Sequence, residues 1–103
     1  MRPRVLVEHA DPRAGIAVAR ALHDVGFAVA TCPGPTQNEP CPLLTGSECS
    51  LALRADVIVS NLTAHPDGRS VAACLRAQLP RTPLLRNVEP HEAAWVVREA
   101  LGS

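Results

Sequence analysis

Apolar residues form two kinds of pattern along this chain, short unbroken runs and stripes at helical spacing. The run Val57–Val59 follows Asp56 and is mostly β-branched, which is typical of a strand covered on both faces in a parallel sheet. Similar runs at Arg4–Glu8, Phe27–Thr31 and Pro83–Arg86 predict three more strands. We therefore expect a sheet of about four strands, with Val57–Val59 in its middle.

The segments between these runs carry helical patterns. Asp11 followed by Pro12 is typical of a helix start, and we expect this helix to run to about Val25, before Gly26. The residues expected on its inner face are Ala14, Val18, Ala21, Leu22 and Val25. Further helices are predicted from Ser47 to about Arg54, from Val71 to near Pro80, and from Pro90 to Gly102.

The alternation of strands and helices predicts the α/β class, with a parallel sheet and right-handed crossovers. We expect the strand order 2-1-3-4 of flavodoxin-like folds, with helices on both faces of the sheet. Residues 1–103 are expected to form a single domain. Within it, four prolines exclude a regular helix or a central strand from the Pro- and Cys-rich loop at residues 32–46.

Charge and composition exclude several classes of partner. Ten basic residues, all arginine, balance ten acidic ones, so no basic surface for nucleic acid is indicated. One Phe, one Trp and no Tyr leave no aromatic platform for stacked bases. No apolar run approaches membrane-spanning length. We therefore expect a cytoplasmic protein with neither a nucleic-acid nor a membrane partner.

Three motifs in order resemble the receiver domain of two-component response regulators, over roughly residues 4–88. Val5–Pro12 resembles the first strand of that family and its acidic turn, and Ala55–Leu62 resembles the third strand, which ends in the phospho-accepting Asp. Pro66–Gly68 resembles the Pro-x-x-Asp-Gly stretch that follows. In the family, that carboxylate attacks a phosphoryl group while Mg²⁺ neutralises the developing charge.

The departures from the family fall on its catalytic positions. Asn61 occupies the attacking position, His9 and Ala10 occupy two acidic metal-binding positions, and only Asp11 matches the third. The chain also lacks the family's Lys and its fifth strand. The resemblance therefore implies a non-phosphorylatable signalling or protein-interaction module, without Mg²⁺ and without enzymatic activity. We expect its ligand or control site at a rim formed by His9, Asp11, Ser60 and Asn61.

The missing fifth strand implies that the fourth strand is a sheet edge. Exposed edges are commonly paired or blunted. We expect Leu84 and Arg86 on this edge, together with Trp95 on the last helix, to bind a protein partner or a second copy of the chain. The alternative is a short polar edge without a binding role.

Three cysteines lie within or beside the Pro-rich loop. Cys32, Cys41 and Cys49 are nine and eight residues apart, and His9 ends the strand expected beside Cys32. This ligand set suits Zn²⁺ or an iron–sulfur cluster, but the chain has no Cys-x-x-Cys pair. We expect no cofactor, with a metal- or redox-responsive sensor as the alternative reading. Cys74 belongs to a helical apolar stripe and is expected in the core.

The third functional hypothesis is a small enzyme. It would use Ser60 or Cys32 as nucleophile and His9 as base. The local sequence has neither a nucleophile elbow nor a Cys-based phosphatase loop, so we expect no catalysis. A simpler role for His9 is a hydrogen bond to a neighbouring loop.

Overall fold

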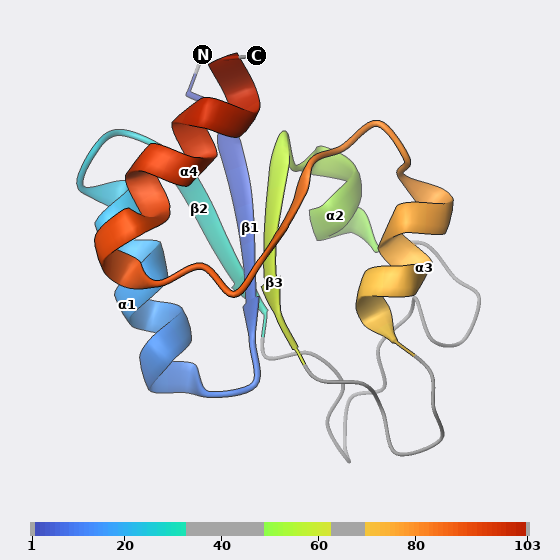
Figure 1. Cartoon of the computed structure of the whole chain (residues 1–103), viewed down its shortest axis with the longest axis horizontal. Helices are drawn as coiled ribbons and strands as arrows, with labels where there is room; N and C mark the ends of the chain where they lie inside the picture. The colour runs from blue at the N-terminus through green and yellow to red at the C-terminus, as the bar shows by residue number, and fades with distance from the viewer. Residues whose placement is uncertain (1, 33–48, 63–69, 103) are drawn as a thin grey trace.

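The computed structural model describes residues 2–32, 49–62 and 70–102. Their strands are β1 (Arg4–His9), β2 (Ala28–Cys32), β3 (Val57–Asn61) and β4 (Leu84–Arg86). Their helices are α1 (Pro12–His23), α2 (Ser50–Arg54), α3 (Val71–Gln78) and α4 (Pro90–Gly102). The four strands form one parallel sheet in the order β2-β1-β3-β4 (Figure 1). The predicted fold class, strand direction and strand order are confirmed.

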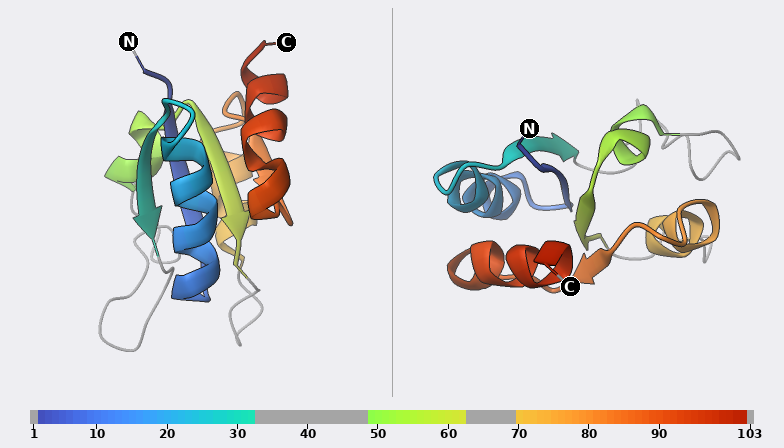
Figure 2. Two further views of the ribbon diagram at one scale, coloured as in Figure 1. Left: turned by 90° about the vertical axis from the view of Figure 1, so that its left-hand side faces the viewer. Right: turned by 90° about the horizontal axis from the view of Figure 1, so that it is seen from above.

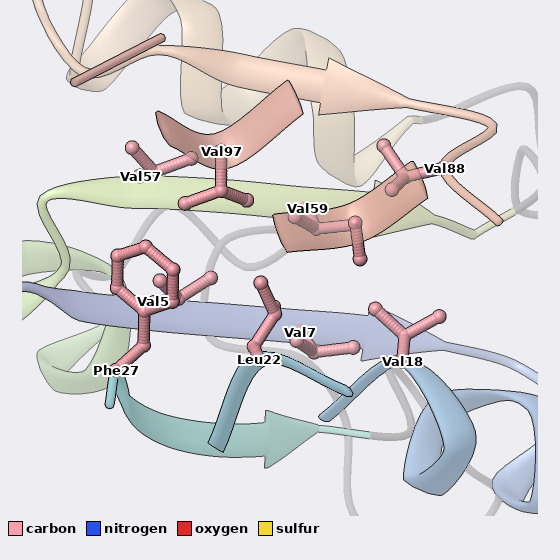
Figure 3. Packing of buried hydrophobic residues seen from close by; sticks show 10 residues of the cluster. Val5, Val7, Val18, Leu22, Phe27, Val57, Val59, Val88 and Val97 are labelled. Carbon is pink, nitrogen blue, oxygen red and sulfur yellow. The ribbon is translucent and has the colours of Figure 1, made fainter. Parts of the chain in front are cut away.

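Helices cover both faces of the sheet, as predicted, with α1 and α4 on one side and α2 and α3 on the other (Figure 2). Successive strand residues alternate between these sides. Val5 and Val7 pack toward α1 and α4, whereas Leu6 packs with Ile58 toward α2 and α3. Figure 3 shows the first of these two cores, whose labelled side chains are Val5, Val7, Val18, Leu22, Phe27, Val57, Val59, Val88 and Val97.

The first helix ends two residues earlier than predicted, at His23. Phe27, the next core residue, donates its N–H to the carbonyl oxygen of Leu22, and this contact requires the chain to leave the helix and turn back. Gly26 makes the turn with φ of 101°, a conformation that favours glycine. Val25 is consequently 42% exposed, and its predicted place on the inner face was wrong.

The described part of α2 begins at Ser50, with Cys49 as its N-cap and no capping side-chain hydrogen bond. The predicted start at Ser47 was therefore too early, and Ser47 itself lies outside the described residues. Most of the Pro- and Cys-rich loop lies outside them as well. Cys74 is half-buried and packs against the α2/α3 core, as expected. Within the described ranges, no helix has the length and apolar character needed to cross a bilayer.

Candidate functional site

The carboxyl ends of β1 and β3 lie side by side, with His9 opposite Asn61 and Glu8 opposite Ser60. Because side chains alternate across a sheet, His9 and Asn61 belong to the α1/α4 side, whereas Glu8 and Ser60 belong to the α2/α3 side. The predicted rim is thus divided between two faces. Ser60 therefore cannot use His9 as its base, and the catalytic hypothesis with Ser60 as the nucleophile was wrong.

Asn61 uses its whole carboxamide inside the protein. Its Oδ1 accepts hydrogen bonds from the backbone N–H groups of Asn87 at 2.6 Å and Val88 at 3.4 Å. Its Nδ2 donates to the carbonyl oxygen of Val88 at 3.3 Å. Asn87 has φ of 57°, in the left-handed region, and the bond to its N–H holds it there. Asn61 therefore connects the end of β3 to the segment between β4 and α4.

His9 and Asp11 organise the turn between β1 and α1. The backbone N–H of Asp11 donates to Nδ1 of His9 at 3.0 Å, and Oδ1 of Asp11 accepts from the N–H of Arg13 at 3.0 Å. The second bond caps the first turn of α1. His9 therefore makes the local hydrogen bond expected of its simpler role, and Asp11 serves as the predicted N-cap.

Gly15 provides a test of how tightly this turn is packed. A Cβ atom at Gly15 would lie 3.1 Å from Cβ of His9, an atom fixed to the strand backbone. Because this contact is closer than ordinary packing, we expect Gly15→Ala to lower the free energy of unfolding by about 1 kcal/mol. The better helix propensity of alanine offsets only part of this loss. Urea denaturation measures this change. In the control Gly102→Ala, the new Cβ meets nothing within 4 Å, so stability should not fall. A Gly15→Ala protein as stable as the control would contradict this packing.

A row of chemically active side chains crosses the other face of the sheet. Cys32, Glu8, Ser60 and Arg86 occupy matching positions on β2, β1, β3 and β4. Glu8 is 2% exposed and Ser60 is fully buried. Oε1 of Glu8 and Oγ of Ser60 have no well-directed hydrogen-bond partner among the described residues. Buried polar atoms are nearly always paired, so this pair is unusual.

Burial raises the pKa of the Glu8 carboxyl above its ordinary value of 4.5, because desolvation disfavours the charged form. The nearby Ser60 hydroxyl and the Arg86 guanidinium oppose this rise more weakly. Arg86 directs its Nη2 to the carbonyl oxygen of Leu62 at 2.9 Å. Glu8 is thus a buried carboxyl biased toward its neutral form. The sequence prediction did not include it, although an acidic residue closing an apolar strand was a visible signal.

The predicted metal ligands are only partly brought together. His9 and Cys32 both border a hollow of about 330 Å³, beside Ile16 and Thr31, but Cys32 packs against the α2/α3 core, whereas His9 belongs to the α1/α4 side. Cys49 packs against the α2/α3 core, and Cys41 lies outside the described residues. The part of the chain that the structure describes contains no group of three His, Cys, Asp or Glu side chains arranged to hold a metal. The full ligand set stays a prediction.

The three predicted interaction residues differ in their availability. Leu84 is half-buried and packs against the α2/α3 core. Arg86 folds its side chain back onto Leu62 through the hydrogen bond described above. Trp95 on α4 is 65% exposed. Trp95 therefore presents its side chain to solvent, whereas Leu84 contributes to the core.

No family model matches this chain, and no curated protein matches it. Among solved structures, it is similar to a de novo designed Rossmann fold protein, with a TM-score of 0.59 and 19% sequence identity. The match covers 96% of this chain and 96% of that one. At this identity, the likeness shows the fold alone, a Rossmann-like α/β arrangement.

Proposed function

We propose that this chain is a cytoplasmic, receiver-like module that acts by binding protein and does not transfer phosphoryl groups. One observation carries the proposal. Asn61, at the position where the family resemblance places the phospho-accepting Asp, uses both polar atoms of its carboxamide for backbone hydrogen bonds to Asn87 and Val88. The residue is therefore a structural connection at this position rather than a reactive group.

The neighbouring residues support the same proposal. Phosphoryl transfer in receivers needs Mg²⁺, which prefers a cage of hard oxygen ligands. His9 offers an imidazole, and its Nδ1 accepts the N–H of Asp11. Ala10 offers no ligand, and an oxygen of Asp11 caps α1 through Arg13. These residues favour a fixed turn over a divalent-cation site.

The wild-type protein tests this proposal in solution. After incubation with a small acyl phosphate and Mg²⁺, we expect intact-mass spectrometry to show no added phosphate. The same incubation without Mg²⁺ controls for unspecific modification by the donor. A Mg²⁺-dependent gain of one phosphate that hydroxylamine removes would contradict the proposal, because hydroxylamine cleaves acyl phosphates.

A metal- or redox-responsive sensor is the second candidate. It is favoured by one observation, the shared hollow of His9 and Cys32. Metal analysis of anaerobically purified wild-type, Cys32→Ser and Cys74→Ser proteins would decide it. Cys74 packs in a helix on the α2/α3 core and is the matched control. Stoichiometric metal that is lost only in Cys32→Ser would favour the sensor. Wild-type protein with no metal and four free thiols would exclude it.

A further inference from the structure

Strand β2 is an outer strand whose far edge has no strand partner in the described part of the sheet. The backbone N–H of Ala28 donates to the carbonyl oxygen of Pro3, the residue just before β1. Because hydrogen bonding alternates along a strand, Ala28 and Ala30 bond toward β1, while Val29 and Thr31 direct their N–H and C=O groups outward. The strand has no charged side chain and no proline. Such an edge lacks the usual protection against pairing.

An apolar hollow lies beside β2 on each face of the sheet. On the α2 side, a hollow of about 200 Å³ is lined mainly by apolar residues, among them Ala28–Ala30 and the 42% exposed Leu51, and is bordered by Arg4 and Arg54. On the α1 side, Thr31 lines the hollow of about 330 Å³ together with Ile16, which is 54% exposed. A strand added along this edge would therefore meet mostly apolar surface on both of its faces.

The opposite edge of the sheet is less suited to pairing. Strand β4 has three residues, compared with five in β2. Two of them, Leu84 and Leu85, pack against the cores, and Arg86 folds onto Leu62. Short edges of this kind are a common protection against strand addition. The edge of β2 is the better candidate for docking.

We propose that β2 pairs antiparallel with β2 of a second copy, about a two-fold axis at Ala30. This inference rests on the proposed binding function and names its partner. In this register, Val29 lies opposite the partner's Thr31 and Thr31 opposite the partner's Val29. The outward groups of these residues then exchange four backbone hydrogen bonds. Val29 and Thr31 are also favourable cross-strand neighbours, since both are β-branched.

The composition of β2 suits pairing with a second copy, because the strand carries no charge that self-pairing would bring together. Val29 and Thr31 flank Ala30 equally, so a two-fold axis matches donors to acceptors without any change in either chain. The two Ala30 residues form the close, non-hydrogen-bonded pair, where small side chains fit. An axis normal to the sheet keeps both α1 helices on one face. Ile16 and Leu51 then lie on the same faces of the sheet as the same residues of the second copy. The two β2 strands carry no charges that would repel each other.

Thr31→Pro tests this pairing with little effect on the rest of the sheet. Proline removes the outward N–H of Thr31, while the ladder with β1 uses Ala28 and Ala30. We expect light scattering to give the mass of two chains for the wild-type protein. We expect Thr31→Pro to weaken dimerisation by about tenfold or more, since the dimer loses two of its four hydrogen bonds. Circular dichroism checks that the variant is folded.

Two further variants keep the test decisive. Ile16→Glu changes an exposed helix residue beside the edge, and it should also weaken the dimer. It replaces Thr31→Pro as the test if the proline variant does not fold. Trp95→Ser is the matched control on α4 and should leave the dimer intact. A wild-type monomer at high concentration, a dimer insensitive to both β2-side variants, or a dimer lost in Trp95→Ser would each overturn the inference. If the wild-type protein is a monomer and takes up no phosphate, the dimer is excluded but the proposed function is not.

Discussion

Replacing Asn61 with alanine should lower the free energy of unfolding by about 3 kcal/mol. The change removes three hydrogen bonds to Asn87 and Val88, and these fix the left-handed turn between β4 and α4. Val88 is 6% exposed, so its backbone groups would be left without partners in a mostly dry environment. Urea denaturation followed by circular dichroism measures the loss.

Asn61→Asp should cost about half as much as the alanine change. A carboxylate can still accept the N–H groups of Asn87 and Val88, but it cannot donate to the Val88 carbonyl oxygen 3.3 Å from the present Nδ2. The expected order of stability is therefore Asn, then Asp, then Ala. Gln78→Ala, an exposed polar change on α3, is the control and should have an effect near zero. Equal stability of the wild-type, Asn61→Asp and Asn61→Ala proteins would contradict a structural role for Asn61.

Glu8→Gln should remove a fall in stability that the wild-type protein shows as pH rises. Burial raises the pKa of Glu8 in the folded protein above 4.5, so the folded state holds this proton more tightly than the unfolded state does. Below about 4.5 both states are protonated and the residue imposes no pH dependence. Above it, the free energy of unfolding falls by up to about 1.4 kcal/mol per pH unit, until the pH passes the pKa of the folded protein.

The measurement is a series of urea denaturations across this pH range on both proteins. The stability of Glu8→Gln relative to wild type should increase with pH and then reach a plateau. Glu99→Gln, an exposed change on α4, is the control for the loss of one negative charge. A difference between Glu8→Gln and wild type that stays constant with pH would mean that Glu8 is not held as a neutral acid.

The sheet was predictable because its signals are local. The apolar run Val57–Val59 and the Asp11–Pro12 helix start each depend on a few adjacent residues. Strand alternation then limits the topology to a few parallel orders, and the expected one is observed. The end of the first helix was not predictable in this way. It depends on the contact between Phe27 and Leu22, which forms only when the chain turns back onto the sheet.

The chemistry at the rim was less predictable because it depends on distant contacts. The role of Asn61 comes from Asn87 and Val88, more than twenty residues later in the chain. The separation of Ser60 from His9 follows from the register of β1 and β3, which apolar patterns alone do not define. Glu8 ends an apolar run, and the sequence prediction gave it no role. It is buried because Ser60 lies beside it on the covered α2/α3 face.

The most direct test of the account is phosphorylation of the Asn61→Asp protein, which restores the carboxylate that the family resemblance requires. Intact-mass spectrometry after incubation with an acyl phosphate and Mg²⁺ gives the answer. We expect no added phosphate, because His9, Ala10 and the capping Asp11 still provide no Mg²⁺ cage. A Mg²⁺-dependent phosphate on residue 61 would show that the rim retains receiver chemistry, and would contradict the proposal that this scaffold has lost it.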